Sequence, residues 1–485
     1  MKKLALLTIF LLLFCVGVEA QDSTVMRIIE IAKTDNQAMK HLDVLSNKIG
    51  GRFIGSDALI TAEEWAIATF KKWGLKVIVE EVGDVPVGFN RGPWFGRMLS
   101  DDGMILHFAT PSYTAGTKGV QRGHVVIAPK DTVSFKRMVG TLNGAWVLIP
   151  GKSEGWPIDT TFMRKEMVEA GALGFIQSAS SPIRVLYDRK HHREYTFDSL
   201  PELPEIKLDE DQYAIIEKKV KEREYFQLEF DIRNHFKPGP VKYRNIIGVL
   251  EGSEFPEEYV IMSGHLDAYD VATGGVDCGS GSAVTLEAAR LLATAGARPK
   301  RTILFCLWTG EEAGLLGSKY WVEQHPEALP KISNMMNRDG GPTVCTGISV
   351  PKAMYDDFVS ICKGIDQINH DFPFTVRINT RIRPKPTTAG GSDYAYFAMA
   401  GVPTITTDLT DPKGYNFDYR EIWHTERDLY NKSIPEYQEH SSVVTAIILY
   451  GIANLDHLLS REGCYLSASS PDPSRNAQKP LPRRD

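Results

Sequence analysis

The chain has 485 residues, which is too long for one compact core of ordinary size and therefore favours two domains. With 43% hydrophobic and 24% charged residues, the composition is that of a soluble globular protein. The formal net charge of −6 and the lack of a long basic run argue against nucleic acid as a partner.

The first twenty residues have the pattern of a secretory signal peptide. Lys2 and Lys3 form a charged start, residues 4–18 are an apolar run, and a small-residue cleavage sequence ends at Ala20. The run is short for a membrane span, so we expect no stable span. Lipidation at Cys15 is disfavoured because the residue before it is bulky. Cleavage near Ala20 predicts a periplasmic or secreted protein.

The mature chain keeps few cysteines, and their number is odd, which excludes a disulfide scaffold. One bridge is left open among the cysteines at 278, 306, 345, 362 and 464.

After the signal peptide the pattern predicts helices and then a strand. Residues 61–70 have apolar side chains at helical spacing, and residues 77–79 form a strand. From about residue 85 to residue 240, short β-rich runs alternate with Gly and Pro turns. The runs expected in this part, with one helix among them, are 123–127, 145–150, 162–170 (helix) and 171–176. This texture indicates a separate β-rich module.

From Tyr243 onward, strands and helices alternate. The expected strands are 260–262, 302–307, 332–336 and 404–406, and the expected helices are 283–293, 311–324, 355–368 and 441–458. Such alternation predicts a largely parallel sheet with helices on both faces. The tail, 464–485, is rich in Pro, Ser and Arg from Ser467 and is expected to be disordered.

Residues of the types that bind zinc recur where these strands end. They are His265, Asp277, Glu312, Asp339 and His424. In open α/β sheets the carboxyl ends of the strands border the ligand-binding crevice, so these residues are expected to converge. Two imidazoles and three carboxylates, one of them shared, can hold two divalent metals and leave positions for water and substrate. Taken singly, each residue also fits a structural role: Asp277, for example, lies in a glycine-rich turn.

Two further acids lie beside this set. On an extended segment Asp267 points to the same side as His265 and can accept its second ring proton, although a buried core histidine is the alternative. Glu311 and Glu312 fit a capping box at a helix start. Because adjacent helical residues point about 100° apart, one of them could instead bind metal while the other acts as general base. The spacing does not say which.

The chain has no His-Glu-x-x-His helix and no Gly-x-Ser-x-Gly elbow, which disfavours one-metal proteases and serine hydrolases. Its motifs instead resemble those of the co-catalytic zinc exopeptidases, the family of bacterial leucyl aminopeptidases and plasma glutamate carboxypeptidase, with the carboxypeptidase Q branch most similar. The segments that carry the resemblance are 45–56, 264–283, 307–317 and 390–394.

The resemblance implies a metal-dependent exopeptidase that acts on dipeptides or short peptides. One metal, with Zn²⁺ expected, would bind His265, Asp277 and Asp339, and a second would bind Asp277, Glu312 and His424. Glu311 would be the general base and Asp267 the partner of His265. The family fold is a mixed-sheet α/β/α sandwich, often with an inserted protease-associated domain.

These expectations give a domain plan. Residues 1–20 are the signal peptide, 21–90 and 241–463 form the discontinuous peptidase domain, and 91–240 form the inserted module. The expected fold class is thus a three-layer α/β/α sandwich with a mixed, mostly parallel sheet and an inserted β-rich domain. A homodimer is left open.

Two residues depart from the family pattern. Cys278 stands where relatives usually have Asp or Asn, and Trp423 stands where some aminopeptidases have a tyrosine. Cys278 with His265 leaves a cysteine hydrolase open. A broad aminopeptidase, a glutaminyl cyclase and a non-catalytic receptor-like relative also stay open.

Substrate contacts are expected near the glycine turn at 390–391. Asp393 follows this turn, and Arg381 and Arg383 precede it in a cationic loop with Lys385. Arginine can bind a peptide's free carboxylate with two hydrogen bonds. A solvated loop is the alternative.

Overall fold

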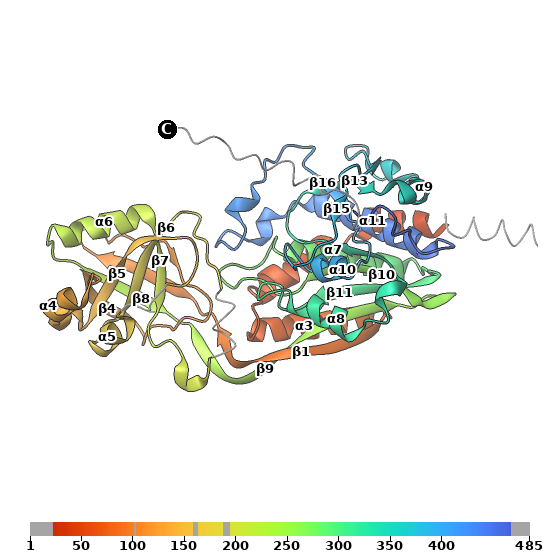
Figure 1. Ribbon diagram of the computed structural model, residues 1–485. Coiled ribbons are helices and arrows are strands. Elements are labelled where there is room, and N and C mark those ends of the chain that lie inside the picture. The colour runs from red at the N-terminus through yellow and green to blue at the C-terminus, as the bar shows by residue number, and fades with distance from the viewer. Residues whose placement is uncertain (1–22, 101–102, 159–162, 188–194, 467–485) are drawn as a thin grey trace, which may run out of the picture.

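The structure is a computed structural model that describes residues 23–100, 103–158, 163–187 and 195–466. The expected signal peptide and the tail beyond residue 466 lie outside the described residues. Two lobes are visible, and a long ribbon of two strands, β1 (Lys76–Asn90) and β9 (His235–Leu250), joins them (Figure 1).

The larger lobe is built on a five-stranded sheet in the order β1-β9-β11-β10-β12. Its other strands are β10 (Phe255–His265), β11 (Arg301–Trp308) and β12 (Ile332–Asn337). β10 pairs in parallel with β11 and β12, whereas β9 pairs antiparallel with β1 and β11. We expected a mixed sheet with mostly parallel pairing, but only two of its four strand pairs are parallel. The antiparallel pairs arise because the chain runs along β1 into the smaller lobe and comes back along β9.

Helices cover both faces of this sheet, since alternate side chains of each strand point to opposite sides. On one face Val260, Ile303 and Phe305 belong to a core that includes residues of α3 (Asp57–Lys72), α7 (Gly279–Thr294) and α11 (Pro435–Asn454). On the other face Ile261 and Leu304 pack with residues of α8 (Leu316–Gln324) and α10 (Tyr394–Met399). The result is three layers.

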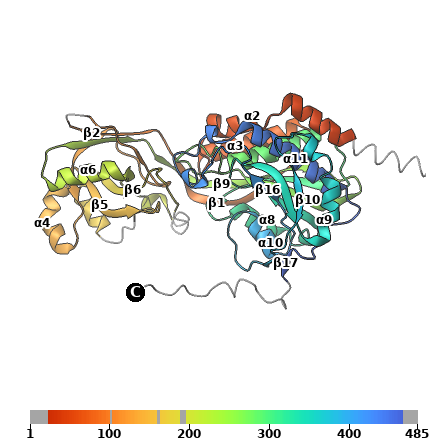
Figure 2. The ribbon, with the colours of Figure 1, turned by 90° about the horizontal axis from the view of Figure 1, so that it is seen from above.

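The smaller lobe holds a seven-stranded sheet in the order β2-β8-β4-β5-β6-β7-β3. Its strands are β2 (Trp94–Leu99), β3 (Phe108–Ala109), β4 (Gln121–Ile127), β5 (Ala145–Ser153), β6 (Gly174–Ala179), β7 (Glu205–Asp209) and β8 (Gln227–Ile232). Three helices accompany them: α4 (Thr132–Leu142), α5 (Arg164–Glu169) and α6 (Glu210–Lys221). The sheet has its own buried clusters, and it stands apart from the larger lobe in both views (Figures 1 and 2).

The remaining elements belong to the larger lobe. They are α2 (Ala38–Asp43), α9 (Tyr355–Ile361), β13 (Val344–Val350), β14 (Thr375–Ile378), β15 (Arg383–Pro384), β16 (Thr407–Thr410) and β17 (Tyr465–Leu466). A three-stranded sheet has the order β14-β13-β16, and β15 pairs with β17. Residues 465–466 are thus in a strand, although they fall in the expected tail.

Three expected elements differ from those observed. The strand expected at 404–406 is an extended segment that ends in β16, which pairs antiparallel with β13 outside the main sheet. The helix expected from 311 begins only at Leu316, after a turn. The helix expected at 355–368 is interrupted after Ile361, where Gly364 adopts a φ of +86°.

Within the described ranges, no helix has the length and apolar character needed to cross a membrane. The cysteines at 278, 306, 345, 362 and 464 are all free.

Candidate metal centre

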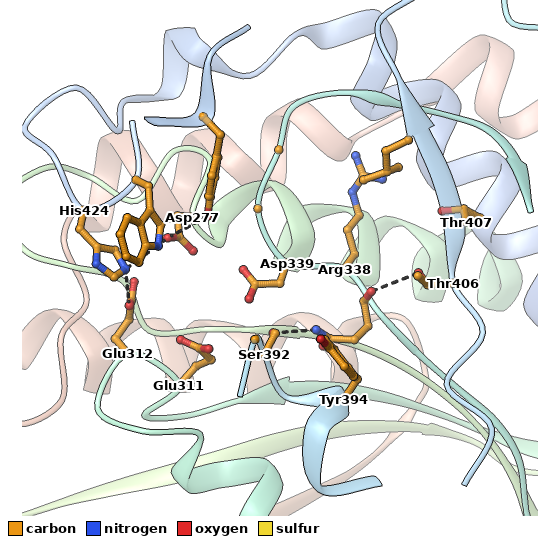
Figure 3. A pocket seen from close by; sticks show the side chains of 17 residues that line it. Asp277, Glu311, Glu312, Arg338, Asp339, Ser392, Tyr394, Thr406, Thr407 and His424 are labelled. Carbon is orange, nitrogen blue, oxygen red and sulfur yellow. Dashed lines mark hydrogen bonds and ion pairs between the residues drawn. The ribbon is translucent and has the colours of Figure 1, made fainter. Parts of the chain in front are cut away.

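A cavity of about 740 Å³ opens at the carboxyl ends of the three parallel strands. β10 ends at His265, β11 ends just before the Glu311–Glu312 turn, and β12 ends just before Asp339. Because parallel strands end at the same edge, these side chains lie close together although they are far apart in the sequence. Figure 3 shows Glu311, Glu312 and Asp339 around the cavity. The cavity is lined by acids, by neutral polar groups, by the apolar side chains of Leu409 and Trp423, and by the cationic Arg338.

The first group of ligand-type atoms surrounds the His265 ring. Its Nε2 lies 3.2 Å from Asp277 Oδ1 and 3.3 Å from Asp339 Oδ1. His265 is fully buried, and the side chain of Asp339 is 17% exposed. The expected set of His265, Asp277 and Asp339 is therefore brought together.

The second group lies on the other side of Asp277. His424 Nε2 lies 2.9 Å from Glu312 Oε2 and 3.6 Å from Asp277 Oδ2. Asp277 thus directs one carboxylate oxygen to each imidazole. All three residues of this group are buried.

Glu311 lines the cavity but is not among the closest ligand pairs. Burial raises the pKa of its carboxyl well above the ordinary range, and Asp339 and Glu312 raise it further, against the opposing effect of His265. Burial and the neighbouring Asp277 raise the pKa of Glu312 in the same way. Such a concentration of buried acids is stabilised when a cation is bound.

Asp267 lies beside His265, as expected, and its carboxylate makes further contacts. His265 Nδ1 lies 2.9 Å from the backbone carbonyl of Asp267, whereas the Asp267 carboxylate is 3.6 Å from that nitrogen. The carboxylate instead accepts hydrogen bonds from the backbone N–H groups of Glu311 (3.1 Å) and Glu312 (3.2 Å). It therefore holds the turn that carries both glutamates, which is why these residues do not start the helix.

The loop of Asp277 is held by two residues that had no place in the expected site. Asp428 accepts hydrogen bonds from the N–H groups of Val276 (2.7 Å) and Asp277 (3.3 Å). Burial, with a contribution from Asp277, raises the pKa of Asp428 to about 8. Arg52 is fully buried and donates to backbone carbonyls of residues 266, 273 and 274. Asp428 shares a motif with His424, but nothing local indicates its contact.

Tyr419 is a further residue without a sequence signal. Its hydroxyl donates to Asp277 Oδ2 at 3.2 Å and lines the cavity. A Cβ at Gly340, where φ is +65°, would lie 2.7 Å from this hydroxyl, so the glycine leaves room for the phenol. Tyr419 therefore places a hydroxyl donor on the carboxylate of Asp277.

The smaller lobe reaches the metal centre through residues 181–187. The N–H of Val185 donates to the carbonyl of His424 at 3.0 Å, and the Arg184 guanidinium lies 5.4 Å from the Trp423 ring centre. The His424 ring stacks on Trp423, with ring centres 4.1 Å apart, and contacts the tilted ring of Tyr269 at 4.2 Å. One candidate ligand is thus positioned by both lobes.

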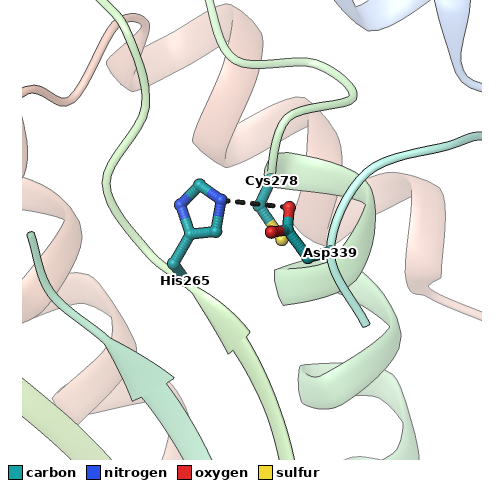
Figure 4. A group of neighbouring side chains, drawn as sticks. All are labelled: His265, Cys278 and Asp339. Atoms are coloured by element: carbon teal, nitrogen blue, oxygen red, sulfur yellow. Dashed lines mark hydrogen bonds and ion pairs between the residues drawn. The ribbon is translucent and has the colours of Figure 1, made fainter. Parts of the chain in front are cut away.

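Cys278 lies beside the first group (Figure 4). Its sulfur, His265 and Asp339 offer ligand atoms within 4.8 Å of one another. The thiol donates to the carbonyl of Arg338 at 3.2 Å, and burial raises its pKa. Because the side chain is fully buried and does not line the cavity, the geometry disfavours a cysteine nucleophile.

The expected substrate residues do not line this cavity. Asp393 is fully buried and accepts a hydrogen bond from Ser318 at 2.5 Å, and burial raises its pKa to about 7. Arg381 and Arg383 line a neighbouring cavity instead. The glycine turn does lead toward the centre, but Ser392 and Tyr394 are the residues it presents there.

The donor set fits divalent metals. Imidazole nitrogens and carboxylate oxygens are the ligands that zinc takes in catalytic sites, and the ion-pair distances here link them in two adjacent groups that share Asp277. The buried carboxylates of Asp277, Glu311 and Glu312 give the site an excess of negative charge, which also favours a bound cation.

Known proteins show the same combination of sequence and fold. Residues 245–448 match the profile of Peptidase family M28. Carboxypeptidase Q of Rattus norvegicus is 24% identical over 440 residues, and that of Homo sapiens is 22% identical over 441 residues; each match covers 88% of both chains.

Two solved structures share the fold. The peptidase M28 precursor of Shewanella amazonensis SB2B has a TM-score of 0.60 at 21% identity, covering 91% of this chain and 98% of the other. BSAP, a zinc aminopeptidase from Bacillus subtilis, has a TM-score of 0.53 at 19% identity, covering 90% and 98%.

Proposed function

We propose that this chain, whose residues 245–448 match Peptidase family M28, is a metallo-exopeptidase that hydrolyses dipeptides or short peptides with two divalent metals, Zn²⁺ at both sites. His265, Asp277 and Asp339 hold one metal. Asp277, Glu312 and His424 hold the other. The observation that carries this proposal is the position of Asp277, whose two oxygens face the two imidazoles at 3.2 and 3.6 Å.

In the proposed reaction, metals held at these residues would supply Lewis acidity, which would make a water more acidic and polarise the substrate carbonyl. Glu311 accepts the proton of the attacking water at its carboxylate and returns it to the leaving amine. Its place on the cavity wall, outside the closest ligand pairs, suits this role. Tyr419 holds Asp277 through its phenol, and Asp267 holds the backbone of the glutamate turn.

The wider organisation follows the same proposal. Residues 21–90 and 241–463 form the peptidase domain, and 91–240 form an inserted protease-associated-type domain. The separate seven-stranded sheet between β1 and β9 supports this division. The signal-like start of the sequence supports export to the periplasm or the medium.

Two isosteric variants test the assignment. Glu311→Gln should keep both metals but lower kcat by about 100-fold or more, because an amide cannot accept the water's proton. Glu312→Gln should instead lose metal, because a charged ligand is removed. Metal content by elemental analysis and rates on a dipeptide library give the two readouts.

The pair of variants also contains its own control, since the two residues are adjacent and the substitutions are identical. If Glu311→Gln is the variant that loses metal, the two roles are exchanged. Faster hydrolysis of long peptides and their amides than of free dipeptides would favour a broad aminopeptidase. Activity that resists chelators and is blocked by thiol alkylation would contradict the metal mechanism.

A further inference from the structure

A second cavity, of about 490 Å³, adjoins the metal-site cavity. Tyr394, labelled among the residues of the metal-site cavity in Figure 3, lines both cavities and is 40% exposed. The segment that precedes β16 is also shared: Thr404 and Ile405 line the second cavity, whereas Thr406 and Thr407 line the first. The two cavities are therefore neighbours along one wall.

The lining of the second cavity is cationic. Arg381 and Arg383 contribute guanidinium groups, and none of the described residues that line the cavity is acidic. Over the described part of the chain neither arginine side chain forms an ion pair or a hydrogen bond. Hydroxyl groups of Thr388 and Thr404 add donors, and apolar lining comes from Ala395, Ala398 and Ile405.

The loop that carries these arginines is anchored at several points. β15, which contains Arg383, pairs with β17. The N–H of Arg381 donates to Asn379 Oδ1 at 2.9 Å, and the hydroxyl of Tyr465 donates to the carbonyl of Val402 at 2.9 Å. An anchored loop offers its charges at less entropic cost than a free one.

We propose that this second cavity binds a carboxylate of a peptide whose scissile bond lies in the metal-site cavity. Arginine binds carboxylates through charge-assisted and often bidentate hydrogen bonds, and the apolar lining suits the chain that carries the anion. The substrates would then be peptides longer than dipeptides that carry a carboxylate near one end. The extra length is needed because Tyr394 lies between the metal-site cavity and the second cavity.

The claim that the bound peptide is cut in the metal-site cavity rests on the proposed function. The claim that the second cavity binds a carboxylate does not. The carboxylate can come from the peptide's C-terminus or from an acidic side chain. Both sources present the same group to the arginines. Peptides in which only the C-terminus or only the last side chain is changed from a carboxylate to an amide distinguish them.

The test compares alanine peptides of two to five residues, each as free acid and as C-terminal amide. A further pair of amides carries Glu or Gln as the last residue. Calorimetry measures their binding to the zinc-loaded Glu311→Gln protein, and wild-type kinetics measure KM and kcat. The altered protein is Arg381→Gln/Arg383→Gln, and the matched control is Lys385→Gln, an exposed cation of the same loop that lines neither cavity.

We expect the free acids of four or five residues to bind roughly 5–10-fold more tightly than their amides, as for two partly exposed charge pairs. The double variant should abolish this difference and raise KM without changing kcat, whereas Lys385→Gln and all dipeptides should be unaffected. Preference for the Glu amide over the Gln amide would identify a side-chain carboxylate as the source.

Equal binding of acids and amides by the wild type, or equal effects of the double variant on both, would overturn the proposal. If the wild type cleaves no peptide, the proposed function fails, and the calorimetric comparison still decides the role of the second cavity.

Discussion

Asp267→Asn separates the role observed for this residue from the one expected from sequence. The carboxylate accepts from two backbone N–H groups, those of Glu311 and Glu312, and is fully buried. An asparagine presents one oxygen, so one N–H would face an amide NH₂ instead. The loss is one hydrogen bond to a charged acceptor together with a buried unsatisfied N–H.

From these two effects we expect the unfolding free energy to fall by about 3 kcal/mol. The experiment is urea unfolding in the presence of a chelator, so that metal binding does not contribute. Asp393→Asn is the matched control. It is another fully buried acid, but it accepts a single hydroxyl, and its raised pKa of about 7 means that a neutral side chain is already tolerated. We expect that variant to lose less than about 1 kcal/mol.

In the metal-loaded enzyme, Asp267→Asn should also lower kcat, because the glutamate turn is no longer held. The reasoning is refuted if the metal-free variant is as stable as the wild type while its affinity for metal falls. That outcome would mean that Asp267 acts on the His265 ring, as the sequence suggested.

Three other predictions concern the pH dependence of stability, the lobe contact and the metals. Burial lowers the pKa of His440 from 6.5 to about 4. Between pH 7 and pH 5 the unfolded state therefore binds a proton that the native state does not. The free energy of unfolding should fall by about 2 kcal/mol over this range. His440→Leu should remove that share of the loss in urea titrations, and identical pH profiles would contradict this. Arg184→Ala should weaken binding of one of the two metals by roughly 2–5-fold in chelator competition, because its contact with Trp423 supports His424, and Arg184→Lys should retain most of the affinity. Asp277→Ala should abolish activity and lower metal content at both groups, and retention of two equivalents by elemental analysis would exclude a shared ligand.

Much of the larger lobe could be predicted from sequence because its signals are local. Apolar spacing places helices near α3, α7 and α11, and short apolar runs place strands at β10, β11 and β12. Since parallel strands end at one edge, the expectation that the residues after them converge needed no knowledge of contacts. The five ligand-type residues do converge.

Pairing and contacts between distant segments could not be predicted in this way. β1 pairs antiparallel with β9, although the residues of the smaller lobe lie between these strands in the sequence. Together with the antiparallel pair of β9 and β11, this pairing makes the sheet mixed. Glu311 and Glu312 have the pattern of a helix start, but Asp267 binds their N–H groups, and the local preference is overridden. Arg381 and Arg383 were expected to contact substrate near the glycine turn, with a solvated loop as the alternative; they line the cavity next to the metal-site cavity, where β15 pairs with β17.

The sequence by itself therefore determined the chemical types of the candidate ligands and the strand ends from which they project, because residue identity and periodicity are local properties. Only the tertiary structure decided that Asp277 lies between two imidazoles, that Tyr419 and Asp428 contact it, and that the smaller lobe touches His424. Apart from the contact of Asp277 with His265, these contacts join residues separated by more than a hundred positions. Their distances depend on how whole layers pack, which no short stretch of sequence encodes.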